Sequence, residues 1–372
     1  MAYLVRRLLE NAANTSFISQ LADPRLSLAE LIESPVNTVR WNPNVSRPQT
    51  GAELFLPRHN ARGYRVDVPT AVTQLQAELN AIKLPVADGS MSVMNPATGE
   101  VVGAYEADTS TSIAIKSKSA LNVAEMFATR MDRSTLLLQV AELYEAHHLE
   151  LLAVLQREAG KTLLDAIGEL REAVDFLRFY ASRPETLQQS EPGIAVCISP
   201  WNFPLAIFTG QIAAAFAAGR AVLAKPAEQT TLCAQLAIAL WSRVLPHESI
   251  VQLICGDGAV VGPELLRQPG VVAVAFTGST DTARVIRNTL ARSTNFRARL
   301  IAETGGLNAC IADSTALPEQ LVRDVVGSAF QSAGQRCSAC RVLLVQSEIY
   351  NEVCEMLVGA MRLLVHGDPT AS

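Results

Sequence analysis

The sequence predicts an α/β protein built around a doubly wound parallel sheet. Short apolar runs alternate with longer segments of helical periodicity between residues 194 and 302. Strands that alternate with helices favour a parallel sheet covered by helices on both faces. The chain has 372 residues, of which 49% are hydrophobic, so two or three domains with substantial cores are expected.

The first 90 residues carry few regular patterns. A helix is expected from Met1 to about Asn14, because its leucines share one face. The stretch from Pro24 to Pro69 is rich in proline and has little apolar periodicity, which is typical of a linker and irregular structure. One short helix is expected over Val72–Ala81.

Regular structure is expected from residue 93 onward. Two short strands joined by a turn are predicted within Val93–Gly103, and three helices follow at Ile113–Ala128, Arg133–Glu158 and Leu163–Ala181. The alternating region then predicts strands at Ile194–Ile198, Ala221–Ala224, Val251–Ile254, Val271–Phe276 and Arg299–Ala302, with helices at Leu205–Ala218, Leu232–Val244, Val260–Arg267 and Thr280–Ala291.

Composition argues against several classes of function. The net charge is −5 and no basic cluster stands out, so nucleic acid is not expected as a partner. No apolar run approaches the roughly 18 residues of a membrane span, and the N-terminus lacks the layout of a signal peptide. Seven cysteines without a framework spacing fit reduced thiols, and we therefore expect a cytoplasmic protein.

Three side chains supply the parts needed to oxidise an aldehyde through a thioester. Cys337 lies in the run Gly334–Ala339, 34 residues beyond Glu303 and 135 beyond Asn202. A thiolate that adds to an aldehyde gives a tetrahedral adduct able to release a hydride, and the thioester left behind needs water. An amide suits the oxyanion, and a carboxylate suits a general base.

The stretches around Asn202, Glu303 and Cys337 resemble the aldehyde dehydrogenase superfamily in order and approximate spacing. The resemblance runs from about Met91 to the last residue. It implies an aldehyde dehydrogenase-like fold, with an NAD-binding domain at 91–303 and the first part of a truncated catalytic domain at 304–372. It also implies that Cys337 is the nucleophile, that Asn202 and the Cys337 backbone N–H hold the oxyanion, and that Glu303 activates water.

Local structural alternatives exist for these residues. Most single cysteines are buried and inert. Asn202 could instead cap the helix expected near Pro204, and Glu303 could be a surface carboxylate.

The region of alternating strands and helices, residues 194–302, contains no GxGxxG motif, so it does not match an ordinary Rossmann dinucleotide-binding fold. Lys225–Thr230 and Phe276–Thr280 stand where a strand feeds a helix, which is where doubly wound sheets bind ligands. Taken alone, the first would be a solvated helix start and the second a turn. The resemblance implies NAD at a site formed by Ser199, Pro200, Trp201, Lys225, Glu228, Gly258, Gly262, Phe276, Gly278, Ser279, Thr304 and Gly305.

Two details of this region bear on the cofactor. A carboxylate at Glu228 would accept from ribose hydroxyls and repel a 2′-phosphate, which favours NAD over NADP. Cys255 stands before Gly256, where relatives tend to have proline, and a small effect on that loop is expected.

The branch is indicated by three stretches of sequence. Ser199–Gln211, Ile301–Ala309 and the surroundings of Cys337 resemble the 1-pyrroline-5-carboxylate dehydrogenase domain of the bifunctional proline utilization A family. Thr304, where many other relatives have leucine, agrees with this branch. The resemblance implies oxidation of L-glutamate γ-semialdehyde to L-glutamate with NAD. It also implies that Ser338 helps to hold the substrate carboxylate and that Phe203 packs against the aldehyde chain.

The N-terminal segment resembles the last helix of the proline dehydrogenase barrel of the same family. Tyr3, Arg6 and Arg7 share a helix face, and two guanidiniums suit a carboxylate such as that of proline. Residues 1–20 are thus expected to be a remnant of that domain, and 21–90 a linker. We expect a fragment of a longer protein that has little activity alone, with FAD bound and homo-oligomers formed only by the full-length protein.

Other functions remain open at this point. Cys337 and Cys340 form a lone CxxC, which could be a regulatory disulfide or, more weakly, a zinc site. A different aldehyde substrate, such as succinate semialdehyde or betaine aldehyde, is the nearest alternative. A non-catalytic dinucleotide-binding chain is a second, and a cysteine acyl hydrolase is a third, although no histidine stands in recognisable register with Cys337.

Overall fold

The computed structural model describes residues 20–34, 50–84, 89–130, 132–183 and 192–370. The chain divides into two compact units, one that ends at Gly51 and one that begins at Ala52. In the first unit, helix α3 (Leu28–Leu31) starts with a capping box in which Ser27 and Glu30 bond each other's backbone N–H groups. The helix expected over residues 1–14, with Tyr3, Arg6 and Arg7, lies outside the described residues.

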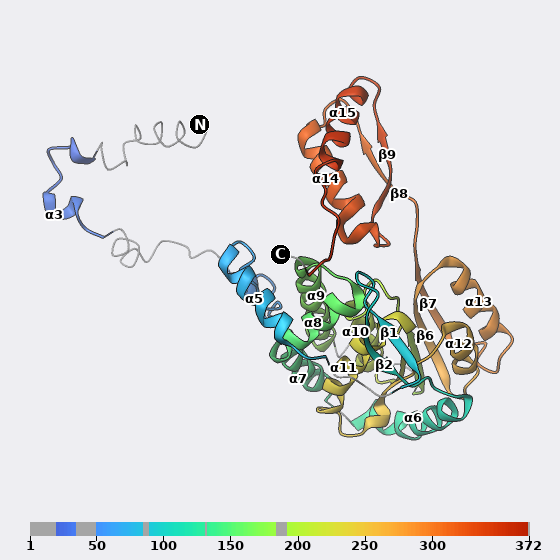
Figure 1. Cartoon of the computed structure of the whole chain (residues 1–372). Helices are drawn as coiled ribbons and strands as arrows, with labels where there is room; N and C mark the ends of the chain where they lie inside the picture. The colour runs from blue at the N-terminus through green and yellow to red at the C-terminus, as the bar shows by residue number, and fades with distance from the viewer. Residues whose placement is uncertain (1–19, 35–49, 85–88, 131, 184–191, 371–372) are drawn as a thin grey trace. The chain divides into compact units, whose positions relative to one another are not determined.

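The second unit is organised by a parallel sheet (Figure 1). Its strands among the described residues are β3 (Ile194–Ile198), β4 (Ala221–Lys225), β5 (Val251–Leu253), β6 (Val271–Gly278) and β7 (Arg299–Thr304). They run in the order β5-β4-β3-β6-β7, and every pairing is parallel. The predicted doubly wound parallel sheet is therefore confirmed.

Helices cover the sheet on both faces, as apolar parallel strands require. Helices α10 (Ala206–Ala217) and α11 (Thr231–Ser242) pack on one face. Behind them lies a layer formed by α7 (Arg133–Ala146), α8 (His148–Ala159) and α9 (Leu163–Ala181). The other face is covered by α6 (Ser110–Arg130), α12 (Gly258–Leu266) and α13 (Thr280–Ala291). Strand β4, which lies between α6 and α10, is buried along its whole length.

One predicted helix is wrong in its extent. Arg133–Glu158 was expected to be continuous, but the chain forms α7 (Arg133–Ala146) and α8 (His148–Ala159), with α9 (Leu163–Ala181) after them. The break is at His147, whose φ of −99° and ψ of 29° leave helical geometry. Apolar spacing continues across this point without Gly or Pro, so periodicity alone gave no sign of the break.

The segment before the sheet also packs on this unit. Helix α5 (Pro69–Ala81) contacts α8, and β1 (Met91–Met94) pairs antiparallel with β2 (Val101–Tyr105). Ala61 is buried, and its backbone N–H donates to the carboxylate of Asp175 over 2.8 Å. The later part of the stretch expected as a linker therefore belongs to the folded unit.

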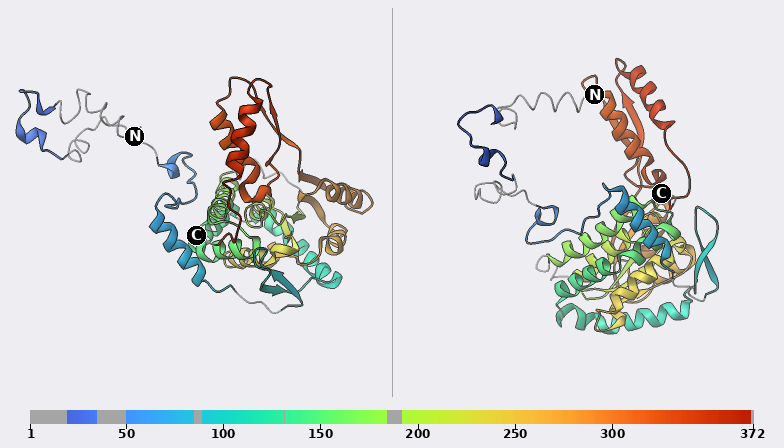
Figure 2. Two further views of the ribbon diagram at one scale, coloured as in Figure 1. Left: turned by 45° about the horizontal axis from the view of Figure 1, so that its top comes forward. Right: turned by 60° about the vertical axis from the view of Figure 1, so that its left-hand side comes forward.

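A second α/β layer follows β7. Strands β8 (Asn308–Ala312) and β9 (Cys340–Val345) pair in parallel, and helices α14 (Pro318–Phe330) and α15 (Tyr350–Met361) accompany them, as both views in Figure 2 show. Several apolar side chains of this pair of strands are exposed, including Ile311 and Leu344. Within the described part of the chain, no helix combines the length and the hydrophobicity that a membrane span needs.

The strand order places a switch point between β3 and β6. The chain proceeds from β3 to β4 and β5 on one side, then returns to β6 and β7 on the other. Loops that leave neighbouring strands in opposite directions open a crevice at the carboxyl ends of the strands, where doubly wound folds bind ligands. The fold thus directs attention to the residues that follow Ile198 and Phe276.

A buried carboxylate closes the layer behind the sheet. Glu158, in the last turn of α8, accepts the backbone N–H groups of Leu232 and Cys233 over 2.6 and 2.7 Å. These are N–H groups of the first turn of α11, which have no partner within the helix. Burial raises the pKa of the Glu158 carboxyl to about 8, although the two N–H groups act in the opposite direction.

This carboxyl should make stability depend on pH. Its folded-state pKa of about 8 exceeds the ordinary 4.5, so the folded chain binds this proton more tightly than the unfolded chain. The resulting stability is fully present below about pH 4.5 and is lost as the pH rises through about 8. Compared with Glu158→Gln, we expect the wild type to lose about 1.4 kcal/mol per pH unit between roughly pH 6 and 8 in urea unfolding.

A control is Glu352→Gln, which changes an exposed carboxylate in the first turn of α15. Its difference from wild type should not vary over this pH range. An equally constant difference for Glu158→Gln would show that Glu158 is ionised in both the folded and unfolded states.

Candidate active site

Cys337 lies on a loop between α14 and β9. The thiol-bearing residue is exposed, and its carbonyl oxygen accepts a hydrogen bond from Asn308 Nδ2 at 2.5 Å. The same amide donates to the carbonyl of Ala339 over 3.0 Å. Because Asn308 begins β8 and pairs in register with Cys340, the loop is fixed to the start of the second sheet.

Asn202 reaches the same loop from the first sheet. It follows β3, and its Nδ2 donates to the carbonyl oxygen of Gln335 over 2.7 Å, two residues before Cys337. Its carbonyl oxygen accepts from Lys161 Nζ over 2.6 Å. Two stretches separated by 133 residues in sequence therefore meet at this point.

The helix-capping alternative for Asn202 does not apply. Helix α10 begins at Ala206 with no side-chain cap from its own residues. The backbone N–H groups of Leu205 and Ala206 donate instead to Glu169 Oε1, over 2.8 and 3.2 Å. Glu169 thus satisfies the start of α10 and leaves the Asn202 amide free to reach the loop.

A pocket of about 440 Å³ lies beside Cys337. Its polar lining is dominated by carboxylates, and burial raises the pKa of both Glu169 and Glu172. The Phe203 ring has Lys161 Nζ 4.4 Å and the Arg336 guanidinium 5.7 Å from its centroid. The lining residues are Leu164, Asp165, Gly168, Glu169, Glu172, Phe203, Ile207, Gln331, Arg336, Cys337 and Ser338.

The structure brings some predicted site residues together and separates one. Cys337, Ser338 and Phe203 line the same pocket. Glu303 is exposed near the end of β7, in register with Thr277 of β6, and is not among the lining residues. Thr304 pairs with Gly278 in the same ladder. Glu303 and Thr304 thus stand at the carboxyl edge of the sheet rather than in the pocket wall.

Lys225 and Glu228 form a pair at the carboxyl end of β4. Lys225 is buried, its Nζ donates to the Pro226 carbonyl over 2.8 Å, and it lies 3.3 Å from Glu228 Oε2. Burial lowers the pKa of the Lys225 ammonium, against the opposing effect of Glu228. The Glu228 side chain is 39% exposed and can meet a ligand. Gly258 adjoins the pair, since a Cβ there would lie 3.5 Å from Lys225 Nζ.

Buried polar atoms without partners lie at the switch point. Gln211 of α10 donates from Nε2 to the Ile198 carbonyl and to Thr277 Oγ1, over 3.2 and 3.1 Å. Its Oε1 and the hydroxyl of Ser199 are buried, and neither has a hydrogen-bond partner among the described residues. Since buried polar atoms are nearly always bonded, this edge of the sheet is suited to a polar ligand.

At the turn from β6 into α13, a Cβ at Gly278 would lie 2.5 Å from the Phe276 ring, so a larger residue would require this ring to move. Ser279 caps α13 by accepting from the Thr282 N–H over 3.1 Å. Of the remaining predicted cofactor residues, Pro200 is half-buried and Trp201 is exposed. A Cβ added at Gly262 or Gly305 would meet no other atom.

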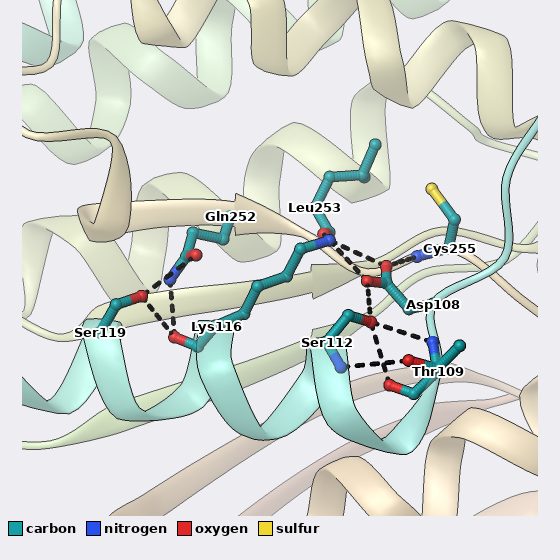
Figure 3. Close-up of polar contacts among 8 residues, drawn as sticks. All are labelled: Asp108, Thr109, Ser112, Lys116, Ser119, Gln252, Leu253 and Cys255. Carbon is teal, nitrogen blue, oxygen red and sulfur yellow. Dashed lines mark hydrogen bonds and ion pairs between the residues drawn. The ribbon is translucent and has the colours of Figure 1, made fainter. Parts of the chain in front are cut away.

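The loop between β5 and α12 is held by an ion pair (Figure 3). Asp108 bonds the N–H of Cys255 and receives Lys116 Nζ over 2.7 and 2.9 Å, while Lys116 also donates to the Leu253 carbonyl. The Asp108 N–H returns a bond to the Cys255 carbonyl over 2.8 Å. Cys255 thus uses a backbone N–H that a proline at this position would lack.

The aldehyde dehydrogenase family model matches residues 85–372. This chain belongs to the aldehyde dehydrogenase family. The family fold accounts for the doubly wound sheet and for the second α/β layer that carries Cys337.

Among related proteins, the bifunctional protein PutA of Escherichia coli is 44% identical over 401 residues. That match covers 99% of this chain and 30% of the relative, so the chain spans about a third of its length. A crystal structure of bifunctional proline utilization A has a TM-score of 0.80 at 41% identity, and covers 99% of this chain and 38% of that one. A 1-pyrroline-5-carboxylate dehydrogenase from Thermus with bound NAD has a TM-score of 0.78 at 27% identity, with 85% and 68% covered.

The cysteines do not form a metal site in the described part of the chain. No three histidine, cysteine or acidic side chains are grouped there in a way that could hold a metal ion. All seven cysteines lie within the described ranges and are free thiols, including Cys337 and Cys340. The regulatory disulfide remains a prediction.

Sequence reasoning missed the residues that hold this aldehyde dehydrogenase site in place. Lys161 and Glu169 form a buried ion pair at 2.8 Å, one end of which supports Asn202 and the other the start of α10. The available signal was a charged residue on the apolar stripe of a helix, where Glu169 is flanked by Ala166 and Leu170. Such a residue is nearly always paired when it is buried.

Removal of one partner should be costly. Lys161→Met leaves the Glu169 charge buried without a counter-ion, and we expect a loss of about 3–5 kcal/mol in the free energy of unfolding. The double variant Lys161→Met/Glu169→Gln should recover part of this loss, because the uncompensated charge is gone. Urea denaturation of the three proteins measures both effects.

Lys118→Met, an exposed change on α6, is the control and should stay within about 0.5 kcal/mol of wild type. A Lys161→Met loss of that same small size would mean that the buried pair contributes nothing.

Proposed function

We propose that this chain carries the NAD-dependent oxidation of L-glutamate γ-semialdehyde to L-glutamate, the second step of proline degradation. The semialdehyde arises by ring opening of 1-pyrroline-5-carboxylate. The observation that carries the proposal is the meeting of Asn202 with the loop of the exposed Cys337, beside a pocket that also holds Phe203 and Ser338. The choice of substrate rests on the similarity to the bifunctional protein PutA and to a 1-pyrroline-5-carboxylate dehydrogenase.

In the proposed reaction, the Cys337 thiolate attacks the aldehyde carbon and forms a C–S bond. The carbonyl electron pair moves to oxygen, where the Asn202 amide and the Cys337 backbone N–H stabilise the negative charge. NAD, when bound, supplies the acceptor for the hydride that leaves this carbon. Glu303 then takes a proton from water, which adds to the thioester, and cleavage of the C–S bond releases the carboxylate and the thiol.

The residues at the carboxyl edge of the sheet fit a dinucleotide. The pair Lys225–Glu228 would hold the adenosine ribose, and the N-termini of α12 and α13 would face the pyrophosphate. The unpartnered hydroxyl of Ser199 and Oε1 of Gln211 leave hydrogen-bonding capacity on the nicotinamide side. We further propose NAD over NADP, because the partly exposed carboxylate of Glu228 would repel a 2′-phosphate.

The pocket suits a short polar aldehyde. Phe203 would pack against the aliphatic part of the substrate, and Ser338 would hold its carboxylate. Glu303 lies outside the pocket lining, on the sheet edge where the cofactor is proposed to bind, which agrees with a base that meets water only after the first step.

We further propose that 91–303 form the NAD-binding domain, that 304–372 form the first part of the catalytic domain, and that 1–20 are a remnant of a proline dehydrogenase domain. Of the linker expected over 21–90, only the part before Ala52 is still proposed as a linker, because the chain from Ala52 on belongs to the folded unit. FAD and homo-oligomer formation are assigned only to a full-length protein that contains this chain. The free thiols are consistent with a reducing compartment such as the cytoplasm.

The first test is direct. We expect Cys337→Ala to abolish semialdehyde oxidation and Asn202→Ala to lower kcat by about 10²–10³, since one oxyanion donor is lost. NADH formation is followed at 340 nm, in this chain or in any longer polypeptide that carries it. Cys310→Ala, a change at another free cysteine, should leave kcat unchanged.

A panel of aldehydes tests the substrate in the same assay. A higher kcat/KM for succinate semialdehyde or betaine aldehyde than for glutamate γ-semialdehyde would move the chain to another branch of the family. Turnover that survives Cys337→Ala would remove the proposed nucleophile altogether.

The cofactor preference is tested separately. Glu228→Gln removes the charge that opposes a 2′-phosphate, so the ratio of the NADP to NAD dissociation constants should fall by about tenfold, the effect of roughly 1.4 kcal/mol. Titration calorimetry measures both constants. Glu264→Gln on α12 serves as a control, and NADP binding as tightly as NAD to the wild type would contradict the assignment.

A further inference from the structure

Asp165 connects the helix behind the pocket to the loop of Cys337. It lies in the first turn of α9, and its side chain is only 4% exposed. One of its oxygens, Oδ1, accepts from Gln331 Nε2 over 2.8 Å and from Arg336 Nη2 over 3.0 Å. These contacts bridge 166 and 171 residues of sequence.

The two donors stand on either side of an unusual stretch of backbone. Ser332 and Ala333 each have a φ of 54°, and Gly334 has a φ of 70°. Left-handed backbone is unfavourable for residues other than glycine and persists only where surrounding contacts enforce it. Gln331 and Arg336, both held by Asp165, are the residues that flank this turn and Gln335.

The rest of the loop is held through its carbonyl oxygens. Arg341 Nη2 donates to the carbonyls of Gly334 and Arg336 over 2.8 and 3.2 Å, and Asn202 donates to that of Gln335. With Asn308 on the Cys337 carbonyl, four successive carbonyl oxygens accept a side-chain donor. Asp165 is the acceptor that fixes the side chains of the same loop.

We propose that Asp165 is a positioning residue for the nucleophile. Asp165 borders the pocket but takes no part in the bond-forming steps proposed above. It acts through its hydrogen bonds to Gln331 and Arg336. By holding both ends of the left-handed turn, it keeps the Gln335 carbonyl against Asn202 and presents Cys337 to the pocket. This inference rests on the proposed function for its catalytic consequence, but its structural part stands on the contacts alone.

The test is Asp165→Asn, which keeps the size of the side chain and removes its charge. A neutral amide oxygen is a weaker acceptor than a carboxylate oxygen, so the hydrogen bonds from Arg336 and Gln331 to this side chain are weakened. The loop should then be correctly placed for only a fraction of the time, so kcat falls in proportion to that fraction. We expect a fall of about tenfold, within the range for residues of one hydrogen-bond network, while the KM for NAD stays within twofold.

Two further variants separate positioning from general stability. Asp132→Ala removes the cap of α7, in which Asp132 Oδ1 accepts the Thr135 N–H over 3.1 Å, and changes no contact of Asp165, Gln331 or Arg336. It should lower the unfolding midpoint and leave kcat unchanged. Gln331→Ala removes an exposed partner and should reduce kcat in the same direction as Asp165→Asn, by a smaller factor, even if Asp165→Asn does not fold.

Hydrogen exchange of the peptide that covers residues 331–338 gives a readout that does not require activity. Exchange should rise at least threefold in Asp165→Asn and Gln331→Ala, and not in Asp132→Ala. If a longer polypeptide that carries this chain is inactive but its variants show this exchange pattern, the proposed function is overturned and the positioning role of Asp165 is supported. If the wild type is active, and Asp165→Asn changes neither kcat nor the exchange of this loop, the positioning role of Asp165 is overturned. The proposed function would then be unaffected.

Discussion

Parallel pairing is the constraint on which the rest of this molecule depends. Because β3 to β7 all run in one direction, every loop that follows a strand emerges at the same edge of the sheet. The loops after Ile198, Lys225, Gly278 and Thr304 therefore leave the sheet at one edge, although they are far apart in sequence. The reversal of strand order between β3 and β6 opens that edge at one place, and the site residues collect there.

Buried carboxylates then fix what the sheet brings together. Glu158 satisfies the start of α11, Glu169 satisfies the start of α10 and pairs with Lys161, and Asp165 holds the loop of Cys337. In each case a carboxyl oxygen accepts the hydrogen bond that water would otherwise accept from an N–H or a guanidinium. Carboxyl groups in this core thus set the position of backbone segments, and two of them, Glu169 and Asp165, line the pocket beside Cys337.

Sequence patterns predicted the elements well because they are local. The strand at Ile194–Ile198 and the helices at Leu163–Ala181 and Thr280–Ala291 are found with the predicted bounds, since apolar period and turn residues act within a few positions. The break at His147 escaped, because nothing in the apolar spacing marks it. Cys337 and Asn202 were singled out by residue type and surroundings, whereas Lys161, Glu169 and Asp165 carry no comparable local signal.

By itself, the sequence determined the fold class and the order of the elements, because hydrophobic periodicity and strand-to-helix turns depend on consecutive residues. The family was indicated by the resemblance of the stretches around Asn202, Glu303 and Cys337. Tertiary structure alone decided that the Asn202 side chain bonds Gln335 and does not cap α10. It also decided that a side chain at position 278 would meet the Phe276 ring, and that Glu303 lies outside the pocket lining. Those outcomes depend on which groups are near one another after packing. Contacts across more than 100 residues follow from the shape of the core, which no short stretch of sequence contains.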